Sequence, residues 1–125
     1  MMSIDITAGE AVDRATILQL KFQHAGPNDA QRLMTEHDDL WDNIESTFGQ
    51  VDAIKTHAER LLAINSRLWE LEDKIRTATS EAETATTGLA IADHNARRSA
   101  EKRSLDNSLG LQPEFKQYAG TCPNA

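Results

Sequence analysis

The chain has 125 residues, 39% of them hydrophobic, and its 20 acidic and 13 basic residues give a net charge of −7. This length suits a single domain with one hydrophobic core. Only two valines are present and no segment sustains an apolar alternation, which argues against a sheet-rich fold. The acidic balance also argues against nucleic-acid binding, because nucleic-acid-binding surfaces are basic.

No segment predicts export or membrane insertion. The N-terminus lacks the basic and apolar regions of a secretory signal, and no apolar run reaches the roughly 18 residues of a transmembrane helix. Cys122 is the single cysteine, which excludes an internal disulfide and fits a reducing compartment. We therefore expect a cytoplasmic protein that does not bind membranes.

The first predicted helix covers residues 8–24. Thr7 and Glu10 have the spacing of a capping box, in which each side chain accepts a hydrogen bond from the other residue's backbone. The glycine and proline of residues 25–27 end the helix.

The second predicted helix covers residues 28–48, with Asn28 as its N-cap and Gly49 at its end. One apolar stripe runs along it. The stripe contains Leu33, Met34, His37, Leu40, Trp41, Ile44 and Phe48.

The third predicted helix, residues 51–79, carries the strongest periodicity. Two sets of residues recur every seven positions, which is the pattern of a helix packed along one seam. The sets are Ile54, Leu61, Leu68 and Ile75, and His57, Ile64, Leu71 and Ala78.

The fourth predicted helix, residues 81–109, begins with a second capping box formed by Ser80 and Glu83. We expect small residues on its inner face, where they would allow a close helix approach. These are Ala82, Ala85, Ala92 and Ala96, with Leu89 among them, while the second half of the helix carries Ile91, Leu105 and Leu109. The tail, residues 111–125, is expected to lie over the bundle as a strap.

Together these elements predict an all-α fold with one domain over residues 1–125. The architecture is a four-helix up-and-down bundle dominated by a long antiparallel hairpin. The hairpin places residue 61 opposite residue 98, and residue 65 opposite residue 94. The core is thin for helices of this length, so we expect self-association, most simply a homodimer.

Polar residues form stripes on three of these helices. The spacing places each set on one helix face. The stripes are Glu10, Asp13 and Lys21 on the first helix; Asn65, Trp69, Glu72 and Arg76 on the third; and Asn95, Arg98 and Lys102 on the fourth.

The stripes have a functional and a structural interpretation. In the functional one, the site binds an anionic metabolite such as a nucleotide or nucleotide sugar. Arg76, Arg98 and Lys102 would then meet negative charge, Trp69 would stack on a ring, and asparagines would fix orientation. In the structural one, the same residues form a polar network that fixes how the helices align.

No phosphate-binding, dinucleotide-binding or zinc-binding motif is present, and no cofactor is expected. Glu-x-x-Asp pairs occur on the first three predicted helices, at Glu10, Glu36 and Glu70. Such pairs on facing helices could hold Mg²⁺ against nucleotide phosphates. A magnesium-dependent all-α nucleotide pyrophosphohydrolase is therefore one alternative.

Three segments resemble motifs of a family of small bacterial proteins of unknown function. Residues 8–21 resemble its P-G-E-L-I-D-K-I-T-I-L-x-I-K, residues 65–76 its N-x-x-L-W-D-I-E-D-x-I-R, and residues 95–106 its N-D-x-R-x-x-L-K-R-x-I-N. The resemblance implies a helical fold without an assigned activity, in a family whose members occur alongside sugar-transfer functions. The family pattern selects largely the same stripe residues. This sequence departs from it at Ala96 and Glu101.

The leading hypothesis is a non-enzymatic helical protein that binds or sequesters a small anionic metabolite. A protein interaction or assembly module is the second hypothesis, in which the stripes only hold helices together.

Overall fold

The computed structural model describes residues 6–49 and 51–110, and these residues form four helices without a strand. The helices are α1 (Ala8–His24), α2 (Pro27–Phe48), α3 (Val51–Arg76) and α4 (Glu81–Ser108). The expected all-α bundle with a long hairpin is confirmed. The expected tail lies outside the described residues.

Local sequence signals explain most helix ends. The Thr7 hydroxyl accepts a hydrogen bond from the Glu10 backbone, and the Ser80 hydroxyl accepts one from Glu83, which is the N-cap half of each predicted capping box. The Glu83 carboxylate accepts its return bond from the Thr79 backbone and not from Ser80. Gly49 ends α2 with a φ of 75°, a left-handed conformation that glycine adopts without strain. The expected N-cap of α2 was wrong. Gly26 occupies that position, because Pro27 is suited to the first helical turn.

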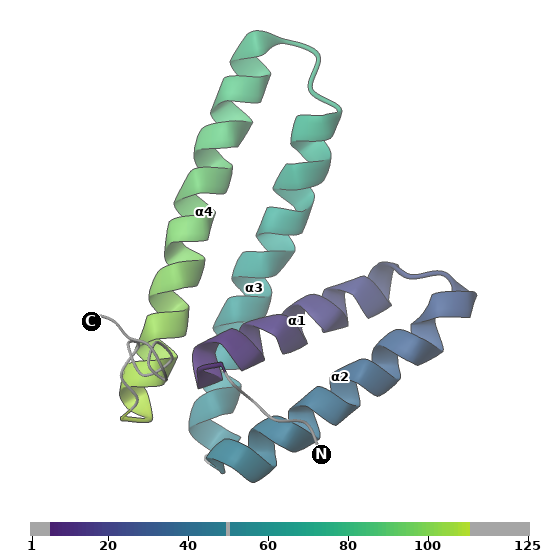
Figure 1. Ribbon diagram of the computed structural model, residues 1–125. Coiled ribbons are helices and arrows are strands. Elements are labelled where there is room, and N and C mark those ends of the chain that lie inside the picture. The colour runs from purple at the N-terminus through teal and green to yellow at the C-terminus, as the bar shows by residue number, and fades with distance from the viewer. Residues whose placement is uncertain (1–5, 50, 111–125) are drawn as a thin grey trace.

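The four helices form two antiparallel hairpins, α1–α2 and α3–α4, that diverge from a common end (Figure 1). Helix α1 occupies the central position, since it packs against each of the other three helices. The hydrophobic core lies where the hairpins meet. It contains Ala8, Ala11, Val12, Ala15, Ile44, Ile54, Ala58, Leu61 and Leu105.

Burial along α3 follows the predicted seam. Ile54, Leu61, Leu68 and Leu71 are buried, whereas Ile75, near the tip of the hairpin, is only partly buried. The heptad interpretation of this helix is thus correct.

The inner face of α4 agrees with the prediction only in part. Leu105 is buried, and Ile91 and Leu109 are partly buried, as expected. The small residues expected on this face are exposed, and Leu89 is 75% exposed. One set of buried and partly buried positions alternates by four and three residues, as it does in a helix with one packed seam. This set contains Thr87, Ile91, His94, Arg98, Glu101 and Leu105. Alanine is compatible with buried and exposed helix positions alike, so its periodicity did not identify the packed face.

No described helix has the length and apolar character needed to cross a membrane.

Candidate functional site

The carboxylate of Asp13 joins three helices. It lies on α1 and is completely buried. Arg98 of α4 binds it with two hydrogen bonds, from Nε to Oδ1 at 2.9 Å and from Nη2 to Oδ2 at 2.5 Å. Asn65 of α3 donates its amide to Oδ1 at 2.9 Å. A buried charge needs such partners, because it has lost its hydration.

Thr16 completes the polar network around Asp13. Its hydroxyl donates to the Asp13 backbone carbonyl at 2.7 Å and accepts a hydrogen bond from the Asn65 amide at 2.9 Å. Thr16 is 3% exposed and Asn65 is 4% exposed, so water has little access. The polar groups buried here therefore bind one another.

A second ion pair continues the junction between α1 and α4. The Lys102 ammonium lies 2.6 Å from the Glu10 carboxylate, and Arg14 approaches the same carboxylate at 3.4 Å. Burial raises the pKa of Glu10, but hydrogen bonds and charge from Lys102, with a further hydrogen bond from Arg14, outweigh it and leave the pKa lowered. The carboxylate is thus held in its charged form.

Gly9 marks the closest approach between α1 and α4. Its backbone amide donates to the Asp106 carboxylate at 2.8 Å. A Cβ atom at this position would lie 2.4 Å from the Lys102 carbonyl oxygen, which is closer than packing allows. Only glycine fits here without a shift of one helix. Asp106 is itself 4% exposed.

The α3–α4 seam contains one more polar contact, between His57 and Glu101. The His57 Nδ1 lies 2.5 Å from a Glu101 carboxylate oxygen, and Arg60 approaches that oxygen at 3.7 Å. This pairing fits the predicted hairpin alignment, in which residue 61 faces residue 98.

The ring of Trp69 is occupied by another side chain. Its indole stacks on the His24 imidazole, with ring centroids 4.4 Å apart and an interplanar angle of 19°. This contact joins the end of α1 to α3.

The remaining predicted site residues lie at the surface. Arg76 pairs with Asp73 on its own helix, and the charge of Glu72 contributes to the raised pKa of Arg98, whose first cause is the hydrogen bond to Asp13. Lys21 and Asn95 are exposed. Asn65 turns toward α1 and binds Asp13, so it does not meet Asn95.

Sequence reasoning missed three members of the junction, namely Gly9, Thr16 and Asp106. A signal for two of them existed. Arg98, Lys102 and Asp106 recur every four residues, which places Asp106 on the same face of α4. Thr16 follows Asp13 by three residues and so shares its face of α1.

The two cations that α4 contributes to the junction are paired with carboxylates of α1. Arg98 and Lys102, the cations expected to meet an anion, bind the carboxylates of Asp13 and Glu10. Within residues 6–49 and 51–110, no three histidine, cysteine, aspartate or glutamate side chains gather as a group that could hold a metal ion. The arrangement is suited to holding helices together.

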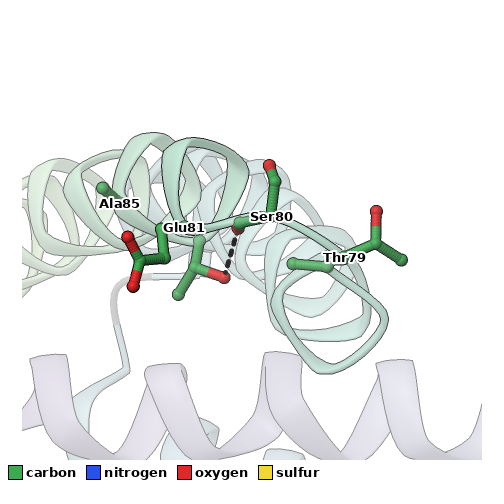
Figure 2. Close-up of a pocket in the computed structure, with 6 residues that line it drawn as sticks. Thr79, Ser80, Glu81 and Ala85 are labelled. Carbon is green, nitrogen blue, oxygen red and sulfur yellow. Dashed lines mark hydrogen bonds between the residues drawn. The ribbon is translucent and has the colours of Figure 1, made fainter.

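A separate hollow of about 430 Å³ lies at the α3–α4 turn (Figure 2). It is open to solvent and contains none of the predicted site residues. Its lining consists of Ala78, Thr79, Ser80, Glu81, Thr84 and Ala85. Thr84 donates its hydroxyl to the Ser80 carbonyl at 3.0 Å, a local hydrogen bond of the helix start.

No family model, curated protein or solved structure matches the chain. The resemblance described above therefore stays a prediction.

Proposed function

We propose that this protein is a non-enzymatic interaction module, in which a polar junction fixes two helical hairpins against each other. The observation that carries this proposal is the bidentate contact of Arg98 with the buried Asp13 carboxylate. Asn65 adds a third hydrogen bond to that carboxylate. These residues connect α1, α3 and α4.

Charge supports this assignment over an anion site. A site for a free anion needs cations that are not already neutralised, because a bound carboxylate competes with the ligand for the same donors. Here the carboxylates of Asp13 and Glu10 already bind Arg98 and Lys102. The long helices can then present their outer faces to other proteins.

The test combines the melting temperature of Arg98→Ala with a metabolite screen of the unmodified protein. If Arg98 is structural, Arg98→Ala lowers the melting temperature by several degrees, and the unmodified protein gains no stability from a panel of nucleotides and sugar nucleotides. An unchanged melting temperature in Arg98→Ala, together with stabilisation of the unmodified protein by one metabolite, would contradict the proposal.

A second candidate function is the binding or sequestration of a small anionic metabolite. It is favoured by the exposure of the Arg98 side chain, which is 30%. Asp13 engages Nε and Nη2, so the opposite edge of the guanidinium has no partner among the described residues. The indole of Trp69 lies on the neighbouring helix.

Isothermal calorimetry tests this second candidate with the same metabolite panel. Binding tighter than millimolar that disappears in Trp69→Ala, with the fold retained, supports it. The absence of any such binding removes it.

The magnesium-dependent hydrolase has less support, because Lys102 and Arg98 occupy the carboxylates of Glu10 and Asp13. Incubation with Mg²⁺ and nucleoside triphosphates tests it, and product formation would restore it.

A further inference from the structure

The outer face of α4 is apolar, exposed and without a partner among the described residues. It consists of Ala82, Ala85, Leu89, Ala92, Ala96 and Ala100, all of them exposed. Leu89 is the most exposed large hydrophobic side chain in the described chain, at 75%; the other is Met34, at 40%. The residues recur every three or four positions, as they do on a helix that packs against another helix.

Within residues 6–49 and 51–110, the other helices leave this face accessible. Thr87, Arg98 and Leu105 point to the opposite side of α4, where they pack against α3 and α1. Figure 1 shows α4 at the edge of the molecule, with α3 and the α1–α2 hairpin on the same side of it. A second helix can therefore reach the outer face without displacing another element.

Charged residues at the two ends of this face favour one particular partner. Glu81 lies 11 positions before Ala92 and Arg103 lies 11 positions after it, and both are exposed. They are about six helical turns apart and lie on the same edge of the face. In the described structure neither forms an ion pair. A helix with acid at its start and base at its end is complementary to a second copy of itself running the other way.

We propose that two copies of this chain associate through the outer faces of α4, packed antiparallel with the Ala92 residues at the two-fold axis. This inference deepens the proposed role as an interaction module and rests on it. Glu81 of each copy then pairs with Arg103 of the other. Leu89 of each copy then lies between the levels of Ala92 and Ala96 of the other.

The side chains fit such an interface. Alanine allows helix axes to approach to about 8 Å, and each Leu89 fills the space over an alanine. A parallel dimer would place Glu81 beside Glu81 of the second copy. The ion pairs therefore determine direction, while the buried apolar face supplies the attraction.

Sedimentation equilibrium measures the association. We expect the unmodified protein to form dimers at micromolar concentration, and Leu89→Glu to raise the dimer dissociation constant at least tenfold. Met34→Glu is the matched control, because it places the same charge at the exposed hydrophobic residue of α2. It leaves the constant unchanged. Circular dichroism verifies that both variants keep their helices.

Charge exchange tests the antiparallel arrangement. Glu81→Arg and Arg103→Glu each place like charges together and weaken the dimer, whereas the double variant restores it. Disulfide trapping gives a second readout. In a Cys122→Ser background, Ala92→Cys forms a covalent dimer on mild oxidation, and Ala53→Cys, at an exposed position of α3, does not.

A monomer at millimolar concentration overturns this inference, and so does a dimer that is insensitive to Leu89→Glu. Neither result affects the Arg98→Ala test of the polar junction, so failure of this inference and failure of the proposed function are distinguishable.

Discussion

Arg98 on α4 binds both carboxylate oxygens of Asp13 on α1, although the two residues are 85 positions apart in the chain. Asp13 is fully buried, whereas Arg98 remains 30% exposed. The carboxylate is thus the member of the pair that depends more strongly on its partners. Replacement of Asp13 is therefore the sharper test of the pair.

Asp13→Ala leaves Arg98 and Asn65 without their shared acceptor. Breaking a buried ion pair by removing one partner costs about 3–5 kcal/mol of unfolding free energy, and partial exposure of Arg98 places the expected loss near the lower end, about 3 kcal/mol. Urea denaturation measures it. Asp39→Ala, at an exposed position of α2, is the control and changes stability by less than about 0.5 kcal/mol. Equal stability of the two variants would show that the carboxylate does not hold the helices.

Gly9→Ala tests the close approach between α1 and α4. The added methyl would lie 2.4 Å from the Lys102 carbonyl, so one helix must move. We expect a loss of about 1–3 kcal/mol, seen as a fall in melting temperature of roughly 5–15 °C. Gly88→Ala is the matched control, because the nearest atom to its added methyl is Ile75 Cδ1 at 4.0 Å. That variant is expected to be slightly more stable, since alanine favours a helix interior by about 0.5–1 kcal/mol.

The lowered pKa of Glu10 predicts a pH dependence. A carboxylate with a lowered pKa stabilises the folded state fully above its ordinary value of 4.5, and this stability disappears as the pH falls through the lowered value. Glu10→Gln is therefore less stable than the unmodified protein at pH 7, by less than about 1 kcal/mol because the pair is partly exposed. The difference closes below pH 4.5. Urea denaturation from pH 7 to pH 3 measures both curves. A difference that stays constant over this range would contradict a role for the Glu10 charge.

Leu105 and Leu89 provide a comparison of two leucines on one helix. Leu105 is fully buried, and its truncation to alanine removes core contacts worth about 2–5 kcal/mol. Leu89 is 75% exposed, so Leu89→Ala changes the unfolding free energy by less than about 0.5 kcal/mol when measured on the monomer. Thermal unfolding at low protein concentration tests both. A larger loss for Leu89→Ala than for Leu105→Ala would show that the packed face of α4 has been assigned incorrectly.

Local patterns predict the helices because helix ends and apolar seams depend on neighbouring residues. The predicted first helix, residues 8–24, has the same bounds as α1. The residues that determine these ends, Thr7 before the helix and the glycine and proline that follow it, lie within a few positions of them. The predicted third helix ended at residue 79, three residues beyond α3. The same local logic failed for the alanine stripe of α4, because alanine fits a buried or an exposed position equally well, whereas it correctly placed Leu105 in the core.

Contacts between distant residues were less predictable. Spacing selected Asp13, Asn65 and Arg98, each from a stripe on its own helix. It could not reveal that one carboxylate binds the other two, because Asp13 lies 52 positions from Asn65 and no short-range pattern links them. The choice between a ligand site and a structural junction depends on such pairings. Helix periodicity alone does not contain them.

The contact between Gly9 and Asp106 spans 97 positions of the chain. During synthesis, α1 and α2 leave the ribosome long before residue 106. The first turn of α1 can therefore dock only after the last turns of α4 have been made. Contacts of such long sequence separation form late, because the intervening chain must first be ordered. Docking of α1 on α4 thus acts as a completion step, in which the junction closes only after the entire α3–α4 hairpin has been made.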